Sequence, residues 1–166
     1  MLLSLLGLTT TRQKALGLFK LKRSNPDYPG ASHVDIGNVF ARTARVERWW
    51  WEYYSQFDFA SVSQSLVTQL RIRRHPTLLS FGATHKNGDL QCTHVAVVID
   101  ATEKKIELLD PLGSAPRVSS NANVWLRAAD WPQPVSVIGS SYSINHESEA
   151  AVLRWTSKES LCLDPE

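Results

Sequence analysis

The stretch CTHVAVVIDATEKKIELLDPLG, residues 92–113, contains two apolar runs joined by a charged turn. Residues 94–100 and 106–110 are rich in valine, isoleucine and leucine, which is typical of buried strands. The connection ATEKK is too short for a crossover, so the two runs can pair only as antiparallel neighbours. The sequence therefore predicts a β-hairpin with His94 at the start of its first strand and Asp110 at the end of its second.

The segments around this hairpin predict both helices and strands. Residues 41–57 contain neither Gly nor Pro and are interpreted as a helix, and residues 61–72 carry apolar side chains along a second helix. Further expected elements are a short strand over 78–82, a turn at Asn87–Gly88, a helix over 121–131, a strand over 134–144, and a helix over 148–159 that Ser148 caps. This order indicates an α+β fold, a small antiparallel or mixed sheet with helices packed on it.

The chain of 166 residues is expected to form a single α+β domain over residues 31–166, preceded by a basic amphipathic segment, residues 1–30. Five basic residues precede the first acidic one, Asp27. This composition suits organelle targeting, contact of residues 1–23 with a membrane surface, or an ordinary helix docked on the domain. The net charge of +2 is too small to favour a nucleic-acid partner.

The number and spacing of the cysteines and histidines limit the kinds of site that the chain can form. Two cysteines do not make a disulfide framework, so free thiols in a reducing, intracellular compartment are expected. The histidines show no metal-ligand spacing, and no metal or other cofactor is expected. No apolar run approaches the ~20 residues needed to span a bilayer.

His94 and Asp110 stand at the same end of the predicted hairpin. A carboxylate beside an imidazole orients the ring and stabilises the imidazolium, as the base of a nucleophilic site requires. The alternative is an ordinary surface hydrogen bond between the two side chains.

The hairpin and the segment after it resemble the adenain-like cysteine proteases of clan CE. This group includes the SUMO-deconjugating proteases, the adenovirus protease and the Yersinia-type effector acetyltransferases. Their pattern is a histidine that opens an apolar strand, VID, a charged turn, and a second apolar strand ending in D-S/P-L/F-G. Here these are HVAVVID, ATEKK and IELLDPLG. The resemblance covers about residues 75–158 and implies a papain-like-derived fold with His94 and Asp110 as catalytic residues.

The nucleophile of this family is missing from its expected place. The family has an oxyanion-hole Gln, followed six or seven residues later by a Cys-Gly that opens a helix. Asn145 stands at the Gln position, and Ala151 and Val152 stand six and seven residues on. The resemblance therefore implies either an engineered Cys→Ala change at Ala151 or a natural pseudoenzyme. Other candidate nucleophiles are Cys92, Cys162 and Ser148.

Three functions follow as hypotheses. The first is a catalytically inactive protease-like protein that acts as a protein-binding module, with a ubiquitin-like tail or another protein as partner. The second is a thiol protease, deubiquitinase-like hydrolase or acyltransferase captured as a Cys→Ala variant at position 151. The third is a structural subunit of a larger assembly, docked by its basic N-terminal segment.

Two surface segments are candidate contact sites. The run RWWWEYY supplies Trp49, Trp50 and Trp51 as candidate partner-binding residues, since exposed aromatic side chains mark interfaces. In a helix, Trp49 or Trp50 would join Tyr53 in the core and leave one ring exposed. The run RIRRH, residues 71–75, is either a site for an acidic partner or a solvated helix end.

Overall fold

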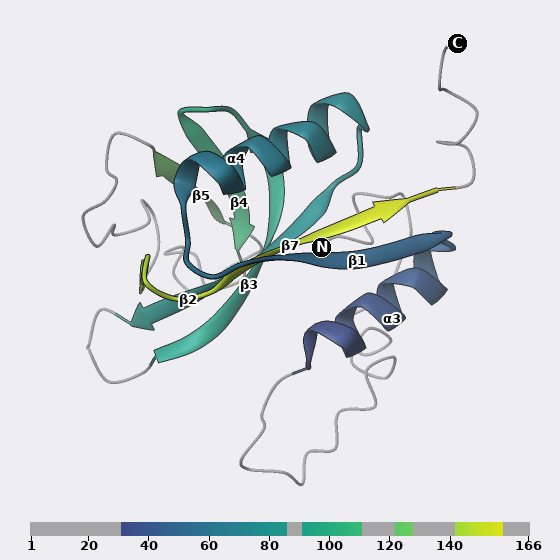
Figure 1. Ribbon diagram of the computed structural model, residues 1–166, viewed down its shortest axis with the longest axis horizontal. Coiled ribbons are helices and arrows are strands. Elements are labelled where there is room, and N and C mark those ends of the chain that lie inside the picture. The colour runs from purple at the N-terminus through teal and green to yellow at the C-terminus, as the bar shows by residue number, and fades with distance from the viewer. Residues whose placement is uncertain (1–30, 86–90, 111–121, 128–141, 158–166) are drawn as a thin grey trace, which may run out of the picture. The chain divides into compact units, whose positions relative to one another are not determined.

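The computed structural model describes residues 31–85, 91–110, 122–127 and 142–157 (Figure 1). The elements in chain order are α3 (His33–Ala44), β1 (Arg48–Tyr54), α4 (Phe59–Val67), the π-helical turn η1 (Thr68–Ile72), β2 (Thr77–His85), β3 (Gln91–Ala101), β4 (Lys105–Asp110), β5 (Ala122–Arg127), β6 (Tyr142–Ile144) and β7 (Ala150–Thr156). Helices packed with an antiparallel sheet confirm the α+β prediction, whereas the papain-like derivation stays a prediction. No helix in the described ranges is long and apolar enough to cross a membrane.

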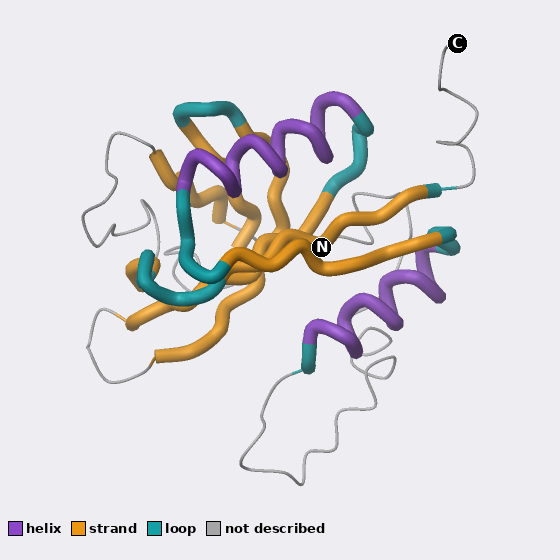
Figure 2. Tube along the Cα trace, in the orientation of Figure 1, coloured by secondary structure: helices purple, strands orange, loops and turns teal. Residues whose placement is uncertain are grey.

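The strands, orange in Figure 2, form one sheet. Their order is β1-β7-β2-β3-β4-β5, and β6 also pairs with β2. The predicted hairpin is confirmed, because β3 and β4 are adjacent and antiparallel, with Val97 opposite Leu109. Thr102 closes its turn, since its hydroxyl accepts a hydrogen bond from the Lys105 backbone N–H at 3.0 Å. Asp58 caps α4 by accepting hydrogen bonds from Ser61, which hold the pKa of this carboxyl below its usual value.

The described residues fall into two compact units, residues 31–51 with 154–157, and those between residues 52 and 153. The core of the larger unit lies between α4 and one face of the sheet. Its fully buried side chains are Val62, Leu66, Leu79, Phe81, Val98, Ile106, Leu108 and Val152. They come from elements far apart in sequence, so the fold depends on long-range strand pairing.

In the smaller unit, α3 packs on the first half of β1. Ser32 and Asp35 form a capping box at the start of α3. The Trp51 ring stacks on His33 with centroids 4.3 Å apart, and its Nε1 donates a hydrogen bond to the His33 carbonyl oxygen at 2.8 Å. The Trp49 ring covers Gly37, where a Cβ would come within 2.2 Å of it.

Three predicted helices require correction. Residues 41–57 are not one helix, because α3 ends at Ala44 and RWWWEYY forms strand β1. Residues 122–127 form strand β5 on β4, and residues 150–156 form strand β7 on β2. Aromatic and β-branched residues favour a pleated surface, and a strand buried on both faces has a continuous apolar run, so its period does not distinguish it from a helix.

Other predicted elements agree with the structure or are not tested by it. The helix predicted over 61–72 is confirmed as α4 with η1, and the strand predicted over 78–82 is part of β2. The strand predicted over 134–144 is confirmed only as β6, since its earlier residues lie outside the described ranges, as do residues 1–30 and the turn at Asn87–Gly88. The division into one domain and a basic segment stays a prediction.

Candidate functional site

His94 lies near the start of β3 and opposite Phe81 of β2. It is only 8% exposed, and its ring meets the Phe81 ring edge to face with centroids 5.4 Å apart. Ala96 and Val98 follow on the same face of the strand and belong to the core. The imidazole therefore lies on the core face of the sheet, against an aromatic ring.

Asp110 ends the strand next to that of His94, as the sequence predicted. Continuing the β3–β4 register one pair beyond Val97 and Leu109 puts Asp110 opposite Ala96. Because residues two apart in a strand share a face, His94 and Asp110 occupy positions on one face. The side chain of Asp110 lies outside the described residues, so a hydrogen bond between the two stays a prediction.

Ala151 and Val152 do not open a helix that faces His94, so that prediction is wrong. Both lie in strand β7, with Ala151 opposite Ser80 and Val152 opposite Leu79 of β2. Ser80 is also opposite Val95, which places Ala151 on the face of the sheet away from His94. At ~4.8 Å per strand, β7 is about 10 Å from β3, and no helix dipole acts at Ala151.

A cysteine placed at Ala151 should therefore be an unreactive thiol. Ala151 is 1% exposed in the middle of the sheet. Burial among apolar side chains raises the pKa of a thiol and keeps the alkylating reagent away from it. Alkylation of Ala151→Cys should therefore be at least about tenfold slower than alkylation of an exposed reference, Glu103→Cys. The measurement is the iodoacetamide rate with Cys92 and Cys162 replaced by serine. Faster alkylation than the reference would restore His94 as a partner of this position.

Asn145 opens a tight turn between β6 and β7, residues 145–149. Its backbone N–H donates to the Gly82 carbonyl oxygen at 2.9 Å, and its own carbonyl oxygen accepts from the Ser148 N–H at 3.1 Å. Its side-chain Oδ1 accepts from the Glu147 N–H at 3.0 Å. These bonds fix the turn and anchor it to β2. Asn145 follows Ile144, which faces the core, so its side chain lies on the other face from His94.

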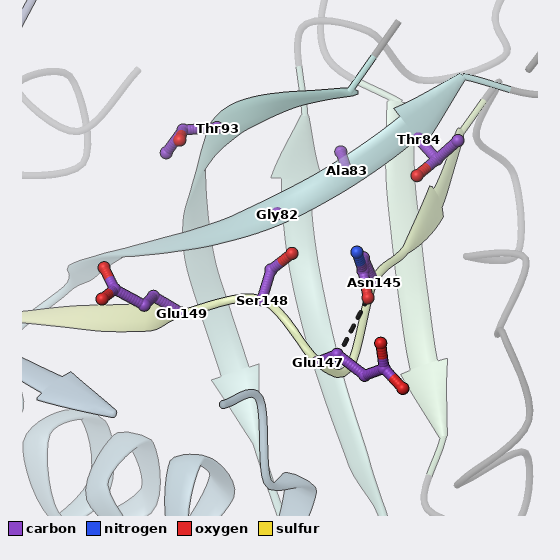
Figure 3. Close-up of a pocket in the computed structure, with 8 residues that line it drawn as sticks. All are labelled: Gly82, Ala83, Thr84, Thr93, Asn145, Glu147, Ser148 and Glu149. Atoms are coloured by element: carbon purple, nitrogen blue, oxygen red, sulfur yellow. Dashed lines mark hydrogen bonds between the residues drawn. The ribbon is translucent and has the colours of Figure 1, made fainter. Parts of the chain in front are cut away.

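Ser148 sits directly over Gly82, and its hydroxyl points toward that strand (Figure 3). A Cβ built on Gly82 would lie 2.3 Å from the Ser148 Cβ and 2.4 Å from its Oγ. The missing side chain is what lets the turn approach β2 so closely. Ser148 belongs to this turn and does not cap a helix, which corrects its predicted role.

A cleft of about 480 Å³ lies between this turn, the end of β2 and the start of β3. Its lining is Gly82, Ala83, Thr84, Thr93, Asn145, Glu147, Ser148 and Glu149 (Figure 3). Gly82 is opposite Thr93 and one residue from Phe81, so the cleft lies on the face away from His94. It offers three hydroxyls, one amide and two exposed carboxylates.

Of the residues that line this cleft, the sequence singled out only Asn145 and Ser148. It predicted Asn145 as an oxyanion-hole residue and Ser148 as a helix cap or a candidate nucleophile. The sequence signal for the cleft is Gly82 inside the run LLSFGATH. An isolated glycine in a strand often marks a place where another segment of the backbone approaches closely. Nothing in the sequence indicates that Gly82 lies near Thr93 or Glu149, because the strand register determines which residues are neighbours.

The aromatic side chains of β1 differ in their exposure. Trp51 is 8% exposed and belongs to the interior, while Trp50 is 42% exposed and Tyr53 is 59% exposed. The expectation that Tyr53 is a core residue is wrong: it shares a strand face with Trp51 but is exposed near the end of β1. Trp50 remains a candidate partner contact. Among the residues that the structure describes, no group of three or more His, Cys, Asp or Glu side chains could hold a metal ion.

Comparisons with known proteins add no family. No protein-family model, no curated protein and no solved structure matches the chain. The resemblance to the clan CE proteases therefore rests on the hairpin motif alone and stays a prediction.

Proposed function

We propose that this chain is a non-catalytic protein-binding module that holds an extended, basic peptide segment in the cleft at residues 145–149. The observation that carries the proposal is the cleft itself. Its volume of about 480 Å³ falls within the ~300–1,000 Å³ typical of ligand sites. The hydrogen bonds that anchor the Asn145 turn to β2 support a pre-formed site, which lowers the entropy lost on binding.

The absence of a paired nucleophile and base within the described cleft supports binding rather than catalysis. Ser148 is the residue of the cleft turn that could attack a carbonyl, and His94 lies on the other face of the sheet. A serine hydroxyl is a weak nucleophile unless a general base lies within hydrogen-bond reach. A thiol hydrolase with its cysteine at position 151 is disfavoured, since that position is a buried strand residue.

The cleft lining favours a basic ligand. Glu147 and Glu149 are exposed on either side of Ser148, and the lining includes no lysine or arginine. Carboxylates accept charge-assisted hydrogen bonds from Lys and Arg side chains. The hydroxyls of Thr84 and Thr93 can bond to a peptide backbone, which gives affinity without reading sequence.

Selection of a displayed random peptide library on the immobilised full chain tests this proposal. We expect the enriched peptides to carry Lys or Arg. The affinity of the best peptide, measured by fluorescence anisotropy, should fall about fivefold to tenfold in Glu147→Gln/Glu149→Gln, because exposed ion pairs contribute modestly. The peptide should also stay uncleaved, as mass spectrometry would show.

The matched control is Glu47→Gln/Glu103→Gln, which removes the same charge from exposed positions outside the cleft. Its affinity for the peptide should stay within about twofold of the unchanged protein. An equal loss in both double variants would reduce the effect to net charge and refute the cleft. Cleavage of the peptide that disappears in Ser148→Ala would make the cleft an active site instead.

A further inference from the structure

The end of η1 presents four consecutive exposed residues, Arg71 to Arg74, here called the arginine turn. Three are arginines, and the fourth, Ile72, is 75% exposed. No other large hydrophobic side chain in the described residues is as exposed. Arginines flank this aliphatic side chain, so one short turn presents an apolar contact and a cationic contact together.

The backbone of the arginine turn is fixed. The Arg73 N–H donates to the Thr68 carbonyl oxygen at 3.2 Å, and the His75 N–H donates to the Gln69 carbonyl oxygen at 3.0 Å. Arg74 has a φ of 54°, a left-handed conformation in which glycine is favoured. This conformation is common where a helix ends, and Arg45 adopts it after α3 with a φ of 53°.

The charge of the arginine turn is only partly balanced. Arg71 pairs with Asp100 at 3.2 Å, and both side chains are about half exposed. Arg73 and Arg74 make no ion pair with any residue that the structure describes. The turn thus keeps an excess positive charge around Ile72.

We propose that the arginine turn is a contact site for an anionic lipid bilayer. In this arrangement Ile72 enters the boundary between headgroups and acyl chains, while the guanidinium groups of Arg73 and Arg74 bond to lipid phosphates and carboxylates. Each arginine near an anionic leaflet strengthens binding about fivefold, and burial of one aliphatic side chain adds about tenfold. A site of this size gives weak, reversible and salt-sensitive contact.

A bilayer fits the turn better than an acidic protein or a nucleic acid. Either of those would satisfy the arginines through phosphates or carboxylates, but neither needs Ile72. Burial of Ile72 by a protein partner requires an apolar neighbourhood to share, and the residues on either side of it are charged. A headgroup boundary accepts a single aliphatic side chain surrounded by cations. This site is independent of the cleft, so either proposal can fail alone.

Cosedimentation of the full chain with phosphatidylserine-containing vesicles tests the proposal, with pure phosphatidylcholine vesicles as reference. We expect binding to the anionic vesicles only, falling as salt rises. Ile72→Ser should weaken binding about tenfold, and Arg73→Gln/Arg74→Gln about twentyfold. Matched controls are Val34→Ser, at another exposed aliphatic residue, and Arg42→Gln/Arg48→Gln, at two other exposed arginines. Both controls should change binding less than about twofold.

Three results would overturn the lipid site. The first is no binding to anionic vesicles. The second is an equal loss of vesicle binding in the test and control arginine variants, which would mean that binding depends only on the net positive charge of the protein. The third is binding that depends on Arg73 and Arg74 but not on Ile72, which would assign the turn to an acidic macromolecule. Circular dichroism of every variant confirms that these surface changes leave the fold intact.

Discussion

Replacing Phe81 with alanine should lower the free energy of unfolding by about 3–5 kcal/mol. Phe81 has no exposed surface, and its ring lies between those of Phe57 and His94, with centroids 6.4 Å and 5.4 Å away. It is also the strand position that opposes both Ala150 and His94. Its loss would open a cavity that three strands line, and strands held on both sides cannot collapse to fill it.

Urea unfolding followed by tryptophan fluorescence measures this loss. Phe81→Leu keeps most of the volume and should cost less than about 1.5 kcal/mol. Tyr53→Ala removes an aromatic ring that is 59% exposed and should stay within about 0.5 kcal/mol of the unchanged protein. If Phe81→Ala cost no more than Tyr53→Ala, the core would not be centred on the β2–β3 pair.

The hairpin was predictable because everything that specifies it is local. Its two apolar runs and the turn ATEKK lie within twenty residues, and a short connection allows only antiparallel pairing. The helix over 61–72 was predictable for the same reason, since its apolar spacing is contained in the segment itself. Short-range pattern therefore gave the centre of the sheet and the helix that covers it.

Strand β7 was not predictable because its partner is distant in sequence. Ala150 pairs with Phe81, about seventy residues earlier, and the other neighbour of AAVLRWT in the sheet, β1, is also distant in sequence. Locally, Ser148 and Glu149 resemble the start of a helix, and alanine and leucine favour one. Tertiary pairing outweighed this preference, as it commonly does for a strand buried on both faces.

The cleft was beyond sequence reasoning for a related cause. A shift of one residue in the β2 register would move Gly82 and Thr84 to the core face and carry Phe81 outward, away from His94. Which residues meet at the cleft is thus decided by the pairing and not by motif spacing. The family motif placed His94 and Asn145 in one site, whereas the alternation of the sheet puts them on opposite faces.

Gly82→Ala should lower the free energy of unfolding by about 1–3 kcal/mol and disrupt the cleft at the same time. The new Cβ would lie 2.3 Å from the Ser148 Cβ, a distance that no pair of real side-chain atoms tolerates. The turn must then move off β2, yet the Asn145 N–H bond to the Gly82 carbonyl at 2.9 Å ties it to that same residue. Either this bond lengthens or the strand bends, and both displace Glu147 and Glu149.

A double-mutant cycle isolates this contact from other effects of alanine in a strand. Ser148→Gly removes the Cβ and Oγ that the new methyl group meets, so Gly82→Ala in the Ser148→Gly background should cost at least about 1 kcal/mol less than in the unchanged protein. Alanine also loses less conformational entropy than glycine on folding, which offsets part of the remaining cost in the Ser148→Gly protein. Equal costs in both backgrounds would mean that the turn does not rest on Gly82. A coupling of the expected sign, together with loss of peptide affinity in Gly82→Ala, would show that the close approach of the 145–149 turn to β2 forms the cleft. The same approach would then explain why position 82 requires a glycine.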